Sequence, residues 1–322
     1  MAVTGRIGRL AGALALAMVM APGAAPAAYP EKDITFVIPF SAGGGFDTYV
    51  RAVVPAMEKY LPNKVNIIPT NVAAAGGAKG ASQVYRAKPD GYTIGVFNIP
   101  GQFVLQQQGE SGYDLNRISW LGSLGRDTYG IAVGWNSPIK SVAELKGLGA
   151  TRKLKFTSTG PASTVYGATL IASELLGMAP EVITGYKGSS DYLLGAVRGD
   201  GDAAIATLPY LRRMQGSQTL RVLATFEPHG TFQGVQDATA LGQPDLAQVT
   251  LERLVGGPPG LPDNIRTVLA EALRKAEQDP AVKAWAAAAD VELTAASPDQ
   301  AAATLRDQAA FFDKWKKYLI AP

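Results

Sequence analysis

The feature that most constrains the fold is a strand, a glycine-rich loop and a helix near the start of the chain. Residues 34–38 (ITFVI) form a β-branched and aromatic run, which predicts a buried strand that Pro39 ends. Three glycines (43–45) follow, and apolar residues then recur with helical spacing over 46–57. Such a loop can turn unpaired backbone N–H groups and the positive end of a helix dipole toward one point. An anion fits there without any basic side chain.

The alternative for this loop is a tight connection that binds nothing. A dinucleotide motif, G-x-G-x-x-G, would need glycine at position 48, where the chain has Thr48. No G-x-x-x-x-G-K-[ST] sequence follows either. The loop therefore favours an anion site that is not a nucleotide phosphate site.

The same design recurs along the chain. Strands predicted over 64–68 and 93–97 are also followed by small or polar loops. This alternation of strands and helices implies a parallel or mixed sheet with flanking helices. Ligands in such sheets lie outside the carboxyl ends of the strands, so we expect loops 39–47, 71–77 and 98–101 to meet at one edge.

The second half of the chain repeats the plan. Strands are predicted over 118–124 and 130–133, separated at 125–127, where we expect the chain to cross into a second domain. A strand at 154–157 then precedes a hydroxyl-rich turn at 158–164 and another helix. The predicted fold class is α/β with two lobes, each a mixed sheet flanked by helices, and a ligand cleft between them. The expected domains are 28–127 with 248–322 for the first, and 128–247 for the second.

Residues 1–27 have the pattern of a cleavable secretory signal peptide. Arg6 and Arg9 precede an apolar run at 10–21 that is too short to span a bilayer, and Ala25-Pro26-Ala27 fits a cleavage site. The chain has no cysteine, which excludes both disulfides and a lipid anchor at the cleavage site. We therefore expect a protein that is secreted out of the cytoplasm and is not a lipoprotein. Without the two arginines, the 30 basic residues fall to 28 against 27 acidic ones, so no basic field favours nucleic acid.

Few residues in the chain suggest catalysis or metal binding. His229 is the only histidine, and a chain with one histidine and no cysteine is a poor candidate for a transition-metal site. Asp200 and Asp202 form a possible carboxylate pair for acid–base work, although a turn that hydrogen-bonds loop amides is favoured. We expect no catalytic residue, no metal and no cofactor.

Short motifs follow one another in a definite order along the mature chain. They are Tyr29-Pro30, Ile38-Pro39-Phe40 with Gly43-Gly44-Gly45 and Asp47, Ala74-Ala75-Gly76-Gly77, Pro89-Asp90-Gly91-Tyr92-Thr93, Ser158-Thr159-Gly160 with Ser163-Thr164, Tyr186-Lys187-Gly188, Gly199 with Asp202, and Pro258-Pro259-Gly260-Leu261-Pro262. Each is weak alone, but the ordered set resembles the tripartite tricarboxylate transporter receptor family, also called the Bug solute-binding proteins.

This resemblance implies a periplasmic binding protein of the two-domain, type II-like kind, with a hinge between the domains. It implies a monomer that captures a small organic mono-, di- or tricarboxylate in the cleft and delivers it to membrane transporter subunits. Family position and the loops described above together place the ligand contacts. The expected contacts are Ser41, Ala42, Gly43, Gly44, Asp47, Ala75, Gly76, Gly77, Asn98, Ser158, Thr159, Gly160, Ser163, Thr164 and Asp202.

The expected mechanism is capture by main-chain donors at the tips of two facing lobes, with no cationic side chain making the main contact. A carboxylate that leaves water needs several donors, and fixed amides supply charge-assisted hydrogen bonds. Two alternatives stay open. One is a ligand-sensing partner of a signalling system, and the other is a secreted enzyme that uses Asp47 or Asp202.

Overall fold

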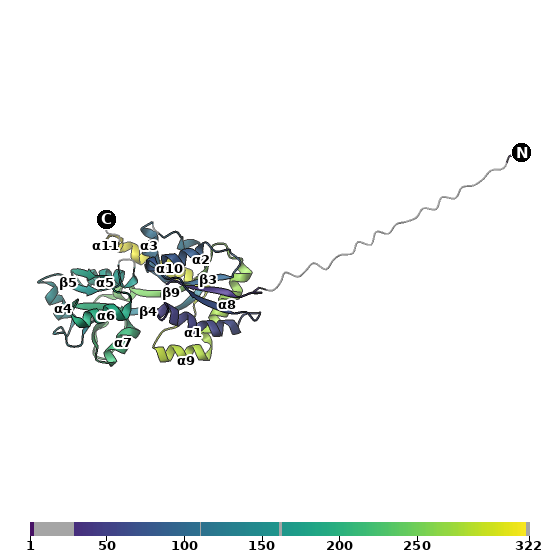
Figure 1. Ribbon diagram of the computed structural model, residues 1–322. Coiled ribbons are helices and arrows are strands. Elements are labelled where there is room, and N and C mark those ends of the chain that lie inside the picture. Colours follow the sequence, from purple (N-terminus) through teal and green to yellow (C-terminus); the bar gives the residue numbers. More distant parts are fainter. Residues whose placement is uncertain (3–28, 110, 161–162, 320–322) are drawn as a thin grey trace.

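The computed structural model describes residues 1–2, 29–109, 111–160 and 163–319 (Figure 1). The predicted signal peptide lies almost wholly outside the described residues. Helices alternate with the strands of one mixed sheet, which confirms the α/β class. No helix in the described part of the chain is both long enough and apolar enough to cross a bilayer.

The bounds of the elements follow the chain order. The strands are β1 Ile34–Ile38, β2 Ile67–Asn71, β3 Thr93–Ile99, β4 Ser119–Gly134, β5 Leu154–Thr157, β6 Pro180–Ile183, β7 Ala203–Thr207, β8 Leu220–Thr225 and β9 Thr250–Gly257. The α-helices are α1 Gly45–Lys59, α2 Ala78–Tyr85, α3 Gly101–Gln107, α4 Val142–Gly149, α5 Thr164–Leu175, α6 Ser189–Arg198, α7 Leu208–Gly216, α8 Asp263–Gln278, α9 Pro280–Ala289, α10 Pro298–Lys314 and α11 Lys316–Leu319. Short 3₁₀ turns are η1 Ala75–Gly77, η2 Leu115–Arg117 and η3 Pro244–Gln248.

The sheet has the strand order β2-β1-β3-β9-β4-β7-β5-β6, with β8 also paired to β4. Strand β1 runs parallel to β2 and β3, and β5 runs parallel to β6 and β7. The long strands β4 and β9 are antiparallel to their neighbours and lie in the middle of the order. The carboxyl ends of the parallel strands in each half therefore carry the loops that the sequence singled out.

Strand β4 differs from its prediction. The sequence suggested two strands separated at 125–127, but one 16-residue strand crosses this stretch without a break. Its pairing partner changes from β9 to β7 between Thr128 and Tyr129. The register of the ladder shifts between Ser123 and Gly125, so Gly125 marks a bulge. A glycine fits there because a Cβ would lie 2.4 Å from the carbonyl oxygen of Glu292. The predicted break between two strands is therefore a bulge inside one strand, at a glycine that permits close backbone approach.

Other boundaries also differ from the prediction. Strand β2 runs over Ile67–Asn71 and not 64–68, and it contains Pro69. Proline is tolerated there because β2 is an edge strand with one unpaired side. The predicted loop 98–101 is the end of β3 followed directly by α3. Helices α3 and α7 were not predicted.

Helix α1 forms as predicted and fixes the loop that precedes it. Phe46, Val50, Val53 and Met57 are buried on one face, at the 3.6-residue spacing of an amphipathic helix. This face packs against β2 and α8, and α8 in turn packs on β4. Helix α8 thus belongs to the same half of the molecule as the first strands.

A buried carboxyl in α8 makes stability depend on pH. Glu277 is 1% exposed, and burial raises its pKa to about 8 despite hydrogen bonds from the amides of Ala295 and Thr294. The folded state holds this proton while the unfolded chain releases it near pH 4.5. The stabilisation is thus complete below pH 4.5 and is lost as pH rises to about 8, at about 1.4 kcal/mol per pH unit.

We therefore expect Glu277→Gln to raise the unfolding free energy at pH 7.5 by on the order of 4 kcal/mol. At pH 4, where the wild-type carboxyl is protonated in both states, the two proteins should unfold nearly alike. Urea unfolding at both pH values measures the difference. If the unfolding free energies of the two proteins changed with pH in the same way between pH 4 and pH 7.5, the raised pKa of Glu277 would be contradicted.

Candidate functional site

A cavity of about 850 Å³ lies at the carboxyl ends of the strands, between the two halves of the sheet. The loop after β1, the turn around η1 and the end of β3 line one side of it. The turn after β5 and the loop before α6 line the other side. The loops predicted to meet at one edge of the sheet do meet.

Most of the predicted contact residues line this cavity. These residues are Ser41, Ala42, Gly43, Gly44, Ala75, Gly76, Gly77, Asn98, Thr159, Gly160, Ser163 and Thr164. Two of them also connect the halves directly, because the Thr164 hydroxyl donates to Asn98 Oδ1 at 2.7 Å. The structure brings the set together, and the role of each residue toward a solute belongs to the proposal below.

Helices α1, α5 and α6 are among those that begin at the cavity wall. Gly44 precedes α1 and Gly188 precedes α6, and neither offers a side chain that caps the first turn. Helix α5 differs, because its N-cap residue Ser163 accepts a hydrogen bond from the amide of Tyr166. The first-turn amides of α1 and α6 therefore remain available to an acceptor, each beside the positive end of a helix dipole.

Asp47, a predicted contact, is not among the residues that line the cavity. Its carboxylate lies behind the glycine loop, where it accepts hydrogen bonds from the Gly43 amide at 2.9 Å, Arg51 Nε at 2.8 Å and Asn71 Nδ2 at 3.0 Å. Burial alone would raise the pKa of Asp47, but these donors outweigh burial and hold the pKa below its usual value. Asp47 shapes the loop and engages the Gly43 amide, which is thus not free for a solute.

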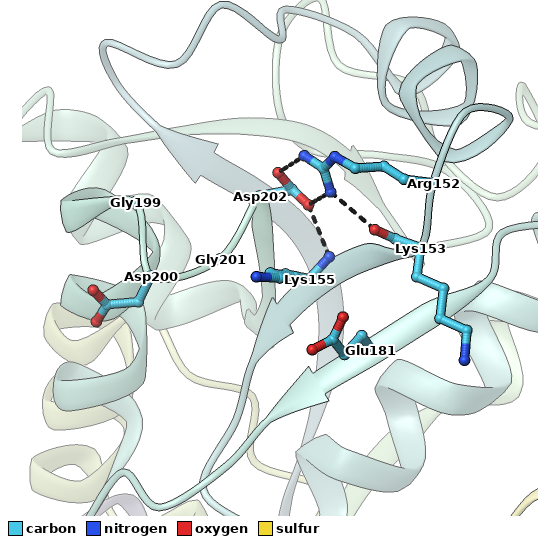
Figure 2. A pocket seen from close by; sticks show the side chains of 8 residues that line it. All are labelled: Arg152, Lys153, Lys155, Glu181, Gly199, Asp200, Gly201 and Asp202. Carbon is cyan, nitrogen blue, oxygen red and sulfur yellow. Dashed lines mark hydrogen bonds and ion pairs between the residues drawn. The ribbon is translucent and has the colours of Figure 1, made fainter.

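Two further predictions place residues in the cleft that the structure places elsewhere. Ser158 is completely buried and lies below the cavity wall. Asp202 lines a separate surface pocket of about 440 Å³, shown in Figure 2. Arg152 contacts both carboxylate oxygens of Asp202, at 2.6 and 2.7 Å. The Lys155 amide donates a hydrogen bond to Asp202 Oδ2 at 2.8 Å.

The suggested carboxylate pair for acid–base chemistry is not formed. Burial would raise the pKa of Asp202, but Arg152 and the Lys155 amide hold it below its usual value. Asp200 points away from Asp202 in Figure 2 and accepts from the Tyr186 hydroxyl and Arg198. Within the described residues, no group of three histidine, cysteine or acidic side chains could hold a metal ion.

Sequence reasoning missed a cationic side chain in the cleft. Arg253 on β9 lines the cavity, and its side chain is only 4% exposed. Its Nη2 contacts Asp127 Oδ2 at 2.5 Å, and its guanidinium lies 4.1 Å from the Tyr49 ring centroid. The expected mechanism gave no cationic side chain the main contact, and Arg253 was not among the predicted cleft residues. The available signal was the charged pair Glu252-Arg253 inside an otherwise apolar strand.

Over residues 49–320 the chain matches the family described as "Tripartite tricarboxylate transporter family receptor". The chain belongs to this family. The resemblance predicted from the ordered motifs is confirmed. Among curated relatives, a UPF0065 protein of Cupriavidus necator is 27% identical over 322 residues, which cover 96% of this chain and 95% of the relative.

Solved structures show the same fold as this receptor. MatC from Rhodopseudomonas palustris, with bound malate, superposes with a TM-score of 0.78 at 21% identity over 91% of this chain and 100% of its own. A second R. palustris protein, solved with adipate, gives a TM-score of 0.79 at 22% identity over 91% and 98% of the two chains. These likenesses confirm the predicted two-domain fold of periplasmic binding proteins.

Proposed function

We propose that this receptor captures a small organic carboxylate in its cleft and delivers it to the membrane subunits of a tripartite tricarboxylate-type transporter. The observation that carries the proposal is the meeting of two uncapped helix starts, those of α1 and α6, at one cavity. Family membership supports it, as do the malate and adipate bound by two structural neighbours.

The geometry suits an anion that leaves water. Each carboxylate oxygen needs replacement donors, and preorganised amides supply charge-assisted hydrogen bonds. Micromolar affinity requires about 8 kcal/mol, which a few such bonds supply together with burial. Since the donors come from both halves, a solute that contacts both favours the closed arrangement by its differential affinity.

We propose the periplasm as the site of action, because residues 1–27 have the signal-peptide pattern and the chain has no cysteine. We propose the domain limits 28–127 with 248–322 and 128–247, since the partner of β4 changes within residues 128–129.

We also propose binding without turnover, by a monomer. Asp47 and Asp202, the two candidates for catalysis, both lie outside the cavity lining and already accept several hydrogen bonds.

A thermal-shift screen of the mature protein against mono-, di- and tricarboxylates tests the function. At 100 times its dissociation constant, a bound acid stabilises the folded state by about 2.7 kcal/mol, so its melting temperature should rise clearly. The neutral methyl esters of the same acids are the controls and should give no shift. The proposal fails if no acid in the panel stabilises the protein, or if chromatography shows that the protein converts the bound acid to a product.

A further inference from the structure

Two cationic side chains, one from each half of the molecule, line the same cavity. Arg253 comes from β9 and Lys187 from the loop between β6 and α6. We propose that the solute carries two carboxylate groups, one held by Arg253 beside the start of α1 and the other by Lys187 beside the start of α6. This inference rests on the proposed function, since it names the class of carboxylate that the cleft selects.

Arg253 keeps donors that no protein group uses. Its buried Nε and Nη1 have no hydrogen-bond acceptor among the described residues, and only Nη2 contacts Asp127. The exposed pair in Figure 2 is different, because Arg152 uses two nitrogens on the two oxygens of Asp202. Leaving guanidinium N–H groups unpaired is more costly in a buried site than at the surface. Buried donors without an acceptor, on a residue that lines the cavity, therefore point to an acceptor that arrives with the solute.

The guanidinium of Arg253 is held in place beside α1. The rings of Tyr49 and Phe46 flank it, with centroids at 4.1 and 5.1 Å, and both come from α1. A Cβ on Gly45, the first residue of the helix, would lie 3.3 Å from Nη2. The guanidinium and the uncapped amides of α1 thus form one anion-holding pole, defined by Arg253 and the start of α1.

Lys187 marks a second pole on the other half. Its side chain is exposed, and its Nζ forms no ion pair with any described residue. The nearby Asp191 is engaged in ordering the loop, because its Oδ2 accepts the Lys187 amide at 3.0 Å. Gly188 follows directly and leaves the first turn of α6 uncapped. This pole, defined by Lys187 and the start of α6, combines an ammonium with a helix dipole.

Two poles on two halves favour a solute with two negative ends. A monocarboxylate can satisfy one pole and leaves the donors of the other solvated. Arg253 and Lys187 are the only lysine or arginine side chains among the described residues that line the cavity, so a third carboxylate would have no cation to pair with. A dicarboxylate places one carboxylate at each pole, and the carbon chain between its carboxylates links the two halves of the molecule.

Calorimetric titration with a matched pair of solutes tests the inference. Succinate or adipate should bind at least about 10-fold more tightly than its own monoamide, which has the same length and one charge fewer. Lys187→Gln should weaken dicarboxylate binding by about 10-fold and leave the monoamide nearly unaffected. Lys153→Gln removes an exposed lysine from the pocket in Figure 2 and should change neither affinity.

The pole at Arg253 is tested by replacing Arg253 and its partner Asp127 together, so that no single buried charge is left. The double variant Asp127→Asn with Arg253→Gln removes both charges and should also reduce the preference for the dicarboxylate. If this variant does not fold, Lys187→Gln decides alone. Equal affinities of the wild type for dicarboxylate and monoamide, or equal losses for both in Lys187→Gln, overturn the inference while carboxylate binding stands. A wild type that binds no carboxylate overturns the proposed function, and the inference with it.

Discussion

A Gly44→Asp variant should bind carboxylates about 100-fold or more weakly, yet unfold at the same temperature as the wild type or above it. Gly44 has φ −81° and ψ 170°, which any residue adopts, and a Cβ there would meet only the Ser41 carbonyl oxygen, at 3.4 Å. Aspartate is a favoured N-cap residue, so its carboxylate should accept hydrogen bonds from the first-turn amides of α1 and leave none for the solute. The substitution stabilises the helix and places a negative charge where the solute should bind.

The matched control for this variant is Gly44→Ala, which adds the same Cβ without a charge or a cap. It should keep most of the affinity, because alanine leaves the first-turn amides open. Calorimetry measures binding, and thermal unfolding without solute measures the effect on α1. Wild-type affinity in the aspartate variant would remove the start of α1 from the binding site.

Asp127→Ala should lower the unfolding free energy by about 3–5 kcal/mol. Asp127 and Arg253 each have side chains that are 4% exposed, and they contact each other at 2.5 Å. Removing the carboxylate leaves a buried guanidinium without its counter-charge, which costs far more than the loss of a surface ion pair. Urea unfolding at neutral pH measures the difference.

Two further variants separate this effect from general damage to β4. The double variant Asp127→Ala with Arg253→Met removes both charges and should recover a large part of the lost stability. Asp200→Ala breaks an exposed pair with Arg198 and should leave the unfolding free energy nearly unchanged. Equal losses in the single and double variants would mean that the pair contributes nothing through charge.

The fold was largely predictable because local patterns and tertiary contacts agree over most of it. The strands 34–38 and 154–157 have the bounds that the sequence predicts. The failures occur where a residue had two possible roles. Gly125 marks a bulge inside one strand, where the sequence predicts a break between two strands. Pro69 lies inside a strand because that strand is at the edge of the sheet.

The candidate site was predictable where it consists of main chain and was missed where it depends on side chains. A glycine-rich loop after a strand is visible in the local sequence, so residues 41–44 and 75–77 could be predicted, and they line the cavity. Arg253 was missed because its place in the cavity depends on pairing between β9 and both β3 and β4. Asp47 was misplaced because a residue near a helix start can face either the solute or its own loop, and spacing does not distinguish the two.

The unbroken course of β4 has a consequence for dissecting the molecule. A gene fragment that stops near residue 128 would cut this strand in the middle and separate its β9-paired part from its β7-paired part. Each recombinant piece would then carry an unprotected sheet edge, which invites aggregation. Fragment swaps between such receptors should therefore be joined in surface loops, and the whole of 119–134 should come from one parent.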